Sequence, residues 1–269
     1  DVLLMRKIPI VWNVHNLVSH GGTERADDEA GRILLDRIDT FVSFTQAGVA
    51  QICDRWPWAK NRQVVVIPHG NFIGAYPDAI SPLEARRRLD LPDDARIALF
   101  LGRIQQYKGL DQLIAAYRSV AGKNDWLVVA GEPENAASMS ALQKLASNHP
   151  RIRFSFHRIP DCEIQTFLNA ADFCVYPFNR IFNSGAVILA LSFRKAVVAP
   201  ATSVLQEVAG PDALLPIFTR RQGLEDALRA AFECENLSFK GRCAYERVYE
   251  RNSWKSVARD FKELYASLL

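Results

Sequence analysis

The segment that decides the fold reads LFLGRIQQYKGLDQLI and spans residues 99–114. An apolar run ends at Gly102 and Arg103, and Lys108 then precedes apolar residues at helical spacing. This pattern predicts a buried strand, a loop and a helix. Arg103 and Lys108 would then lie at the carboxyl end of a strand, where open α/β sheets bind ligands. The two cations suit one anionic group such as a phosphate, and the alternative is a pair of solvated loop cations.

Composition bounds the class of protein. Hydrophobic residues make up 49% of the 269 residues, which is enough for a sizeable core and unlike a disordered chain. The net charge of +3 is too small to indicate a nucleic-acid partner. The five cysteines lack zinc-site spacing and indicate a reducing compartment. No apolar run approaches the roughly 20 residues of a membrane span. We therefore expect a cytoplasmic protein, with a peripheral contact on the anionic inner face of the plasma membrane.

Short apolar runs alternate with helical patterns along the chain, which predicts a doubly wound, Rossmann-like α/β fold with parallel sheets. The glycine- and proline-rich segment at residues 68–82 breaks both periodicities and marks a domain boundary. Six strand-like runs follow this segment and three precede it. Three strands are too few for a complete domain, and the chain opens with Asp1. We expect the first part to be the later portion of a longer domain.

Ser184, Gly185 and Ala186 form a second candidate anion site. They follow the apolar run at residues 173–176 and open an apolar helical pattern. Serine is a favoured N-cap, glycine allows close backbone approach, and a helix N-terminus attracts anions. A plain helix cap is the alternative. Because both candidate sites follow strands of one sheet, we predict a single phosphate site made of Gly102, Arg103, Lys108, Ser184, Gly185 and Ala186.

The order of these motifs resembles the GT-B glycosyltransferases, especially the family-4-like, group 1 transferases of bacterial exopolysaccharide synthesis. The most specific element is the segment at residues 102–109, and the resemblance extends over residues 10–268. It implies a hexosyltransferase that moves a sugar from a UDP- or GDP-linked donor to a hydroxyl of a lipid-linked or polysaccharide acceptor. It also implies that Arg103 and Lys108 hold the donor diphosphate. Neither metal nor cofactor is expected, since these cations can neutralise the leaving group.

The resemblance further implies a division of the chain into three parts. Residues 1–75 would be a partial N-terminal, acceptor-side Rossmann-like domain. Residues 76–252 would be the C-terminal nucleotide-sugar-binding domain, and residues 253–269 a helix packing back on the N-terminal part.

His15 and Glu24 are the candidate catalytic residues. His15 ends a strand-like run, as a histidine does in the resembled family, and would contact the donor sugar or its phosphate. Glu24 lies in a glycine-rich segment and could deprotonate the acceptor hydroxyl. The alternatives are a hydrogen-bonded loop histidine and an ordinary acidic helix start.

The chain departs from the family at two positions. Many retaining members have two glutamates eight residues apart, where this chain has Ile181 and Leu189. Neither side chain can accept a hydrogen bond from a sugar hydroxyl, so we favour an inverting transfer.

Two other classes of function are alternatives to transfer. A non-catalytic nucleotide-sugar-binding subunit that needs a partner half stays open. A dinucleotide-dependent oxidoreductase is disfavoured, because the strand-to-helix turns lack the GxGxxG fingerprint. Trp56 and Trp58, which lie among basic residues, are a candidate membrane or acceptor contact, with a capped, half-buried helix end as the alternative.

Overall fold

The computed structural model describes residues 8–17, 37–217 and 222–269. The chain divides into two compact units. The first comprises Asp1–Gly70 and Arg251–Leu269, and the second comprises Asn71–Glu250. Each unit is described by itself.

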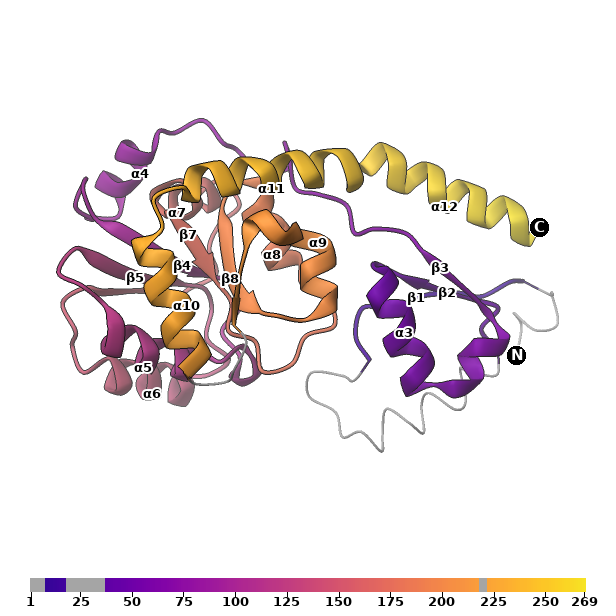
Figure 1. Ribbon diagram of the computed structural model, residues 1–269, viewed down its shortest axis with the longest axis horizontal. Helices are drawn as coiled ribbons and strands as arrows, with labels where there is room; N and C mark the ends of the chain where they lie inside the picture. Colours follow the sequence, from indigo (N-terminus) through magenta and orange to yellow (C-terminus); the bar gives the residue numbers. More distant parts are fainter. Residues whose placement is uncertain (1–7, 18–36, 218–221) are drawn as a thin grey trace. The chain divides into compact units, whose positions relative to one another are not determined.

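The second unit is built on a parallel sheet of six strands in the order β6-β5-β4-β7-β8-β9 (Figure 1). In chain order these strands are β4 (Arg96–Leu101), β5 (Asp125–Ala130), β6 (Ile152–Ser155), β7 (Phe173–Val175), β8 (Ala196–Pro200) and β9 (Leu214–Ile217). β4 pairs with β5 on one side and with β7 on the other, so the strand order reverses between β4 and β7. Such a reversal is a topological switch point, where the loops diverge at the carboxyl edge and leave room for a ligand.

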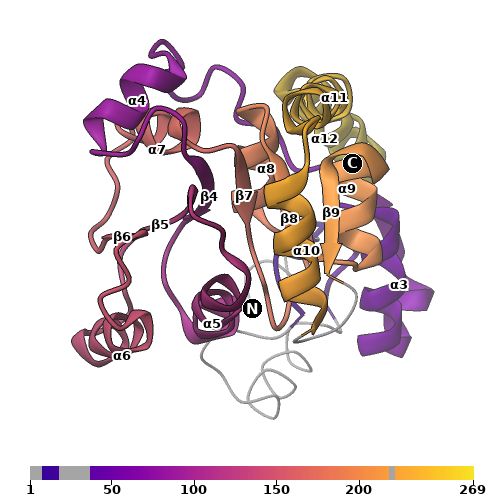
Figure 2. The ribbon, with the colours of Figure 1, turned by 60° about the vertical axis from the view of Figure 1, so that its left-hand side comes forward.

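Helices cover both faces of this sheet. They are α4 (Pro82–Arg88), α5 (Leu110–Val120), α6 (Ala136–Ala146), α7 (Ile164–Ala170), α8 (Gly185–Ser192), α9 (Ser203–Ala213), α10 (Gln222–Glu233) and α11 (Leu237–Arg251). α5 packs against α6 and α10, and α4 packs against α7 on the opposite face (Figure 2). A sheet covered on both faces needs strands that are apolar on both sides, which is the pattern of this chain.

The core of the second unit confirms the strand-loop-helix pattern predicted for residues 99–114. Residues 97–101 of β4 are each at most 5% exposed. α5 begins at Leu110 and buries Leu113, Ile114 and Tyr117, which recur at helical spacing. The loop between these two elements therefore lies at the carboxyl edge of the sheet, as the sequence predicts.

The described residues of the first unit form a smaller parallel sheet of three strands in the order β1-β2-β3. Its elements are β1 (Val11–Asn13), β2 (Thr40–Ser43), α3 (Gln46–Arg55), the 3-10 helix η1 (Pro57–Asn61), β3 (Gln63–Val66) and α12 (Trp254–Leu268). Val257 and Leu264 of α12 pack against Val42 and Ile67 of the sheet region, so the end of the chain contributes to this core.

Trp56 belongs to the core of the first unit. Its side chain is 7% exposed, and its ring lies 5.1 Å from that of Trp12 and 6.4 Å from that of Phe41, measured between centroids. Trp58 is half-buried and packs on Phe41 at 5.5 Å. The membrane contact considered for these tryptophans is therefore wrong for Trp56, because its ring is buried against Trp12 and Phe41.

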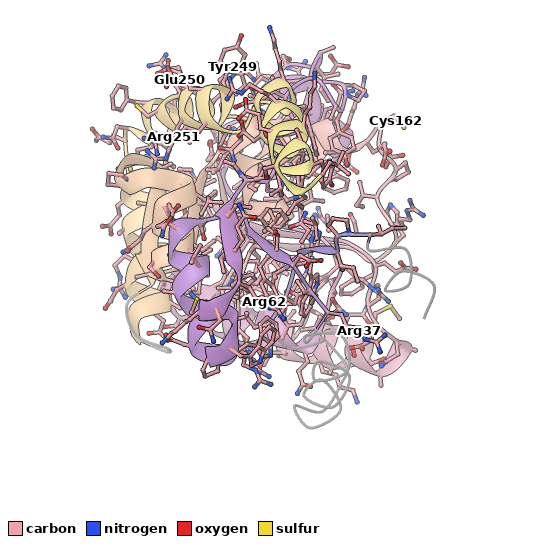
Figure 3. All side chains as sticks on the ribbon, turned by 90° about the vertical axis from the view of Figure 1, so that its right-hand side faces the viewer. Arg37, Arg62, Cys162, Tyr249, Glu250 and Arg251 are labelled. Carbon is pink, nitrogen blue, oxygen red and sulfur yellow. The ribbon has the colours of Figure 1, made fainter. Side chains whose placement is uncertain are left out.

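All five cysteines are free in the structure. Cys162 is exposed (Figure 3), and Cys174 is buried in β7. Burial raises the pKa of the Cys174 thiol to about 12, so this side chain behaves as a small apolar residue.

We predict that Asp172 is a main anchor of the second unit. Its carboxylate accepts hydrogen bonds from Arg86 at 3.1 Å and from the backbone N–H of Ile97 at 2.7 Å. The Arg86 side chain is only 12% exposed, so removing the carboxylate leaves a poorly hydrated cation unpaired. Asp172→Ala should lower the free energy of unfolding in urea by about 2 kcal/mol.

A matched control is Asp93→Ala. Asp93 pairs with Arg87 at 3.3 Å, but both side chains are largely exposed. Its loss should cost at most about 0.5 kcal/mol. Equal losses in the two variants would contradict the anchoring role of Asp172.

Candidate functional site

Lys108 lies in the loop between β4 and α5, in the 3-10 helix η2 (Gln106–Lys108). Its side chain turns back over the end of β4. The Nζ atom lies 5.9 Å from the ring centroids of both Phe100 and Tyr107. A Cβ atom built on Gly102 would lie 3.5 Å from Nζ, and Gly102 has a φ of +145°, which favours glycine. The ammonium group therefore sits above the strand end, between two aromatic rings.

The electrostatics of this loop favour an anion. Burial, and next the nearby charge of Arg103, lower the pKa of Lys108 to about 8. None of the ion pairs formed among the described residues includes Lys108 or Arg103. The Arg103 side chain is exposed and therefore hydrated, as in the alternative of a solvated loop cation, whereas the half-buried Lys108 ammonium would be neutralised by an incoming phosphate.

Ser184 is the N-cap of α8, as predicted. Its side-chain oxygen accepts a hydrogen bond from the backbone N–H of Val187 at 3.2 Å, and the helix begins at Gly185. The first N–H groups of a helix have no partner within the helix, and its dipole is positive at this end. Gly185 and Ala186 supply two of these N–H groups. The chemistry of this helix start therefore suits a phosphate.

The two candidate anion sites flank the switch point of the sheet. The Lys108 loop follows β4, and the loop that leads to Ser184 follows β7, which is paired with β4. The backbone N–H of Asn179, in the second loop, donates to the carbonyl oxygen of Tyr107 in the first at 2.8 Å. The structure thus joins the two loops by a direct hydrogen bond at the carboxyl edge of the sheet, the side on which open α/β sheets bind ligands.

His15 belongs to the first unit and follows β1. Its ring meets that of Phe44 edge-on at 5.1 Å, and Phe44 in turn meets His69 edge-on at 5.2 Å. Burial, and next the charge of His69, lower the pKa of His15. A neutral imidazole at neutral pH can accept a proton or a hydrogen bond.

His69 is a residue that the sequence analysis did not single out. Its Nδ1 atom lies 2.6 Å from the carbonyl oxygen of Gly70, which can only accept, so Nδ1 carries the proton. The signal that could have found it is its position shortly after the end of β3, at the same sheet edge as His15. Glu24, the other candidate catalytic residue, lies outside the described residues.

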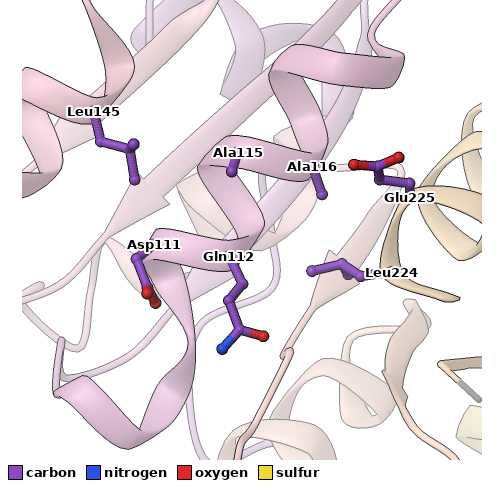
Figure 4. Close-up of a pocket in the computed structure, with 7 residues that line it drawn as sticks. All are labelled: Asp111, Gln112, Ala115, Ala116, Leu145, Leu224 and Glu225. Atoms are coloured by element: carbon purple, nitrogen blue, oxygen red, sulfur yellow. The ribbon is translucent and has the colours of Figure 1, made fainter. Parts of the chain in front are cut away.

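A groove of about 450 Å³ lies beside α5 (Figure 4). It is lined by Asp111, Gln112, Ala115, Ala116, Leu145, Leu224 and Glu225. Two of these described lining residues are carboxylates and none is basic. The groove therefore does not suit a diphosphate.

A doubly wound parallel sheet whose strand order reverses at a switch point is the architecture of many nucleotide-binding α/β proteins. Residues 83–244 match the model of the glycosyl transferases group 1 family. The chain therefore belongs to the group 1 glycosyltransferases.

Curated relatives extend the match beyond this region. The D-inositol 3-phosphate glycosyltransferase of Corynebacterium efficiens is 27% identical over 282 residues, which cover 97% of this chain and 66% of that protein. The GDP-mannose:glycolipid 4-beta-D-mannosyltransferase of Xanthomonas campestris pv. campestris is 26% identical over 211 residues, covering 76% of this chain and 54% of that one. The match to a further D-inositol 3-phosphate glycosyltransferase, from Kineococcus radiotolerans, spans 33% of its length.

Solved structures show the same fold. Sucrose-phosphate synthase from Thermosynechococcus elongatus superimposes with a TM-score of 0.81 at 22% identity, covering 99% of this chain and 70% of that one. Anabaena HepE in complex with UDP and glucose superimposes with a TM-score of 0.80 at 16% identity, covering 98% and 73%. These likenesses confirm the predicted GT-B fold.

Proposed function

We propose that the protein transfers a hexosyl group from a nucleoside diphosphate sugar to a hydroxyl group. The observation that carries this proposal is the half-buried ammonium of Lys108, which lies beside Arg103 at the switch point without a carboxylate partner among the described residues. Family membership supports the reaction class. The GDP-mannose donor of the Xanthomonas relative and the UDP-glucose bound in a structure of Anabaena HepE support a GDP- or UDP-linked donor.

In this proposal the phosphate site stabilises the nucleoside diphosphate, which is the leaving group of the transfer. Lys108, Arg103 and the first N–H groups of α8 would bind the diphosphate as negative charge develops on it. Fixed donors in a partly buried crevice act more strongly than the same groups in water. We propose that these groups make the transfer independent of a metal ion and of any cofactor.

The acceptor side of the proposal rests on the first unit. We propose that residues 1–75 belong to an acceptor-side domain, with His15 near the donor phosphate and Glu24 as the base that deprotonates the acceptor. Ile181 and Leu189 present apolar side chains on the β7–α8 loop and on α8. They supply no hydrogen-bond acceptor for a sugar, which favours an inverting reaction that needs only a base and a stabilised leaving group.

The acceptor is proposed to be a lipid-linked or polysaccharide hydroxyl, in keeping with the glycolipid named for the Xanthomonas relative. A cytoplasmic location with peripheral membrane contact belongs to the same proposal. No helix in the described part of the chain is long and apolar enough to cross a bilayer.

The proposal predicts binding of UDP or GDP that depends on this site. Isothermal titration with UDP, GDP, ADP and TDP should give saturable binding for at least one, and that ligand at 100 times its dissociation constant should add about 2.7 kcal/mol of stability. Incubation with UDP-glucose and GDP-mannose should release the matching nucleotide. Absence of binding to all four nucleotides would refute the proposal. Binding without release of nucleotide, even with added glycolipid, would favour a non-catalytic binding subunit.

A further inference from the structure

Two loops far apart in the sequence are joined at the proposed phosphate site. The β4–α5 loop carries Lys108, and the β7–α8 loop leads to the Ser184 helix start. Asn179, in the second loop, makes one hydrogen bond to the first loop and one to the helix α5 that follows it. Its backbone N–H donates to the Tyr107 carbonyl oxygen at 2.8 Å. Its side-chain oxygen accepts a hydrogen bond from Nε2 of Gln112, at the start of α5, at 2.9 Å.

The packing beneath these bonds leaves little freedom between the loops. A Cβ atom on Gly109 would lie 2.4 Å from the carbonyl oxygen of Pro177, so only glycine allows this approach. Gly109 also has a φ of +70°, a conformation that glycine adopts at low cost. The two loops therefore touch through backbone, and a small shift of one must move the other.

Aromatic rings continue the contact below the backbone. Phe100, which lies under the Lys108 ammonium, meets Tyr176 edge-on at 5.8 Å. Tyr176 stacks on Phe178 at 5.6 Å, one residue before Asn179. The rings that contact Lys108 are thus packed in series with those of the β7–α8 loop. Nearer the surface, the two hydrogen bonds of Asn179 join the same two regions.

We propose that Asn179 and Gln112 are positioning residues, which hold the Lys108 loop and the β7–α8 loop in one fixed geometry for the diphosphate of the donor. This inference rests on the proposed function. Neither residue needs to touch the ligand. Their bond restricts the motion that the backbone contacts still leave to the loops, so that less freedom is lost when the ligand binds.

The test measures the dissociation constants of UDP and GDP for Asn179→Ala and Gln112→Ala. The two variants remove one hydrogen bond from opposite ends, so each should weaken binding about three- to tenfold. The double variant should bind no more weakly than either single one. Gln143→Ala, an exposed glutamine on α6, is the matched control and should bind like the wild type.

A second readout separates positioning from a general loss of structure. In the Asn179→Ala background, Lys108→Met should cost about threefold less affinity than in the wild type, because Lys108 is already less well placed. Fully multiplicative effects of the two changes would overturn the proposal, as would wild-type binding by both Asn179→Ala and Gln112→Ala. Either of these two results would leave the proposed function intact, provided that the wild type binds nucleotide and that Lys108→Met weakens this binding. Absence of binding by the wild type refutes both.

Discussion

Lys108→Met is expected to weaken the binding of UDP or GDP by roughly 10- to 100-fold at pH 7, because a charged hydrogen bond contributes about 1.5–3 kcal/mol. Methionine has a similar length and keeps the contact with the Phe100 and Tyr107 rings, so the change removes charge rather than volume. Isothermal titration calorimetry gives the dissociation constants directly.

The fold of this variant should be unharmed. The wild-type ammonium is partly buried and has no carboxylate partner among the described residues, so its loss relieves desolvation. The melting temperature without ligand should therefore stay equal or rise. Lys144→Met, on the exposed surface of α6, is a matched control for the loss of one positive charge. If Lys108→Met and Lys144→Met bind nucleotide equally well, Lys108 has no role in the site.

The affinity for nucleoside diphosphates is expected to fall steeply above pH 8. Lys108 has its pKa lowered to about 8 by burial and by Arg103, so it is protonated below this pH and neutral above it. Only the protonated form attracts the diphosphate. The association constant should be level between pH 7 and about 8, then drop by up to tenfold per pH unit. Binding at pH 8 should also take up a proton, since a bound anion raises the pKa of the lysine.

Lys108→Arg is the control for this pH dependence. A guanidinium keeps its charge throughout this range. Its affinity for UDP or GDP should therefore stay level from pH 7 to 9.5, whatever its absolute value. Proton uptake is measured by titration in two buffers of different ionisation enthalpy. A wild-type profile as flat as that of Lys108→Arg would show that Lys108 does not titrate in the site.

Much of the fold could be predicted from local sequence patterns. The apolar run before Gly102 and the helical spacing after Gly109 are properties of neighbouring residues, and both elements form where expected. Ser184 could be recognised as an N-cap for the same reason, because capping depends on the residue and on the three that follow it. Parallel strands share a carboxyl edge, so the sequence also predicts that both loops lie on one side of the sheet.

Other features depend on residues that are distant in the sequence. The sequence left Trp56 open as a membrane contact, but β1 and β2 bring Trp12 and Phe41 against it. No local pattern marks His69, and only the folded sheet brings it near His15. Asn179 and Gln112 are 67 positions apart, and no local pattern predicts their bond.

The sequence by itself determined the α/β class, the strand-loop-helix at residues 99–114 and the family that the chain belongs to. These follow from side-chain periodicity and from motifs that span a few residues. The tertiary structure decided how far Lys108 is desolvated and how far its pKa is lowered. The Lys108 ammonium is partly buried at the end of β4, where Phe100, Tyr107 and Gly102 lie near it. Desolvation depends on all atoms within a few ångströms, whichever part of the chain supplies them, and only the folded chain brings those atoms together.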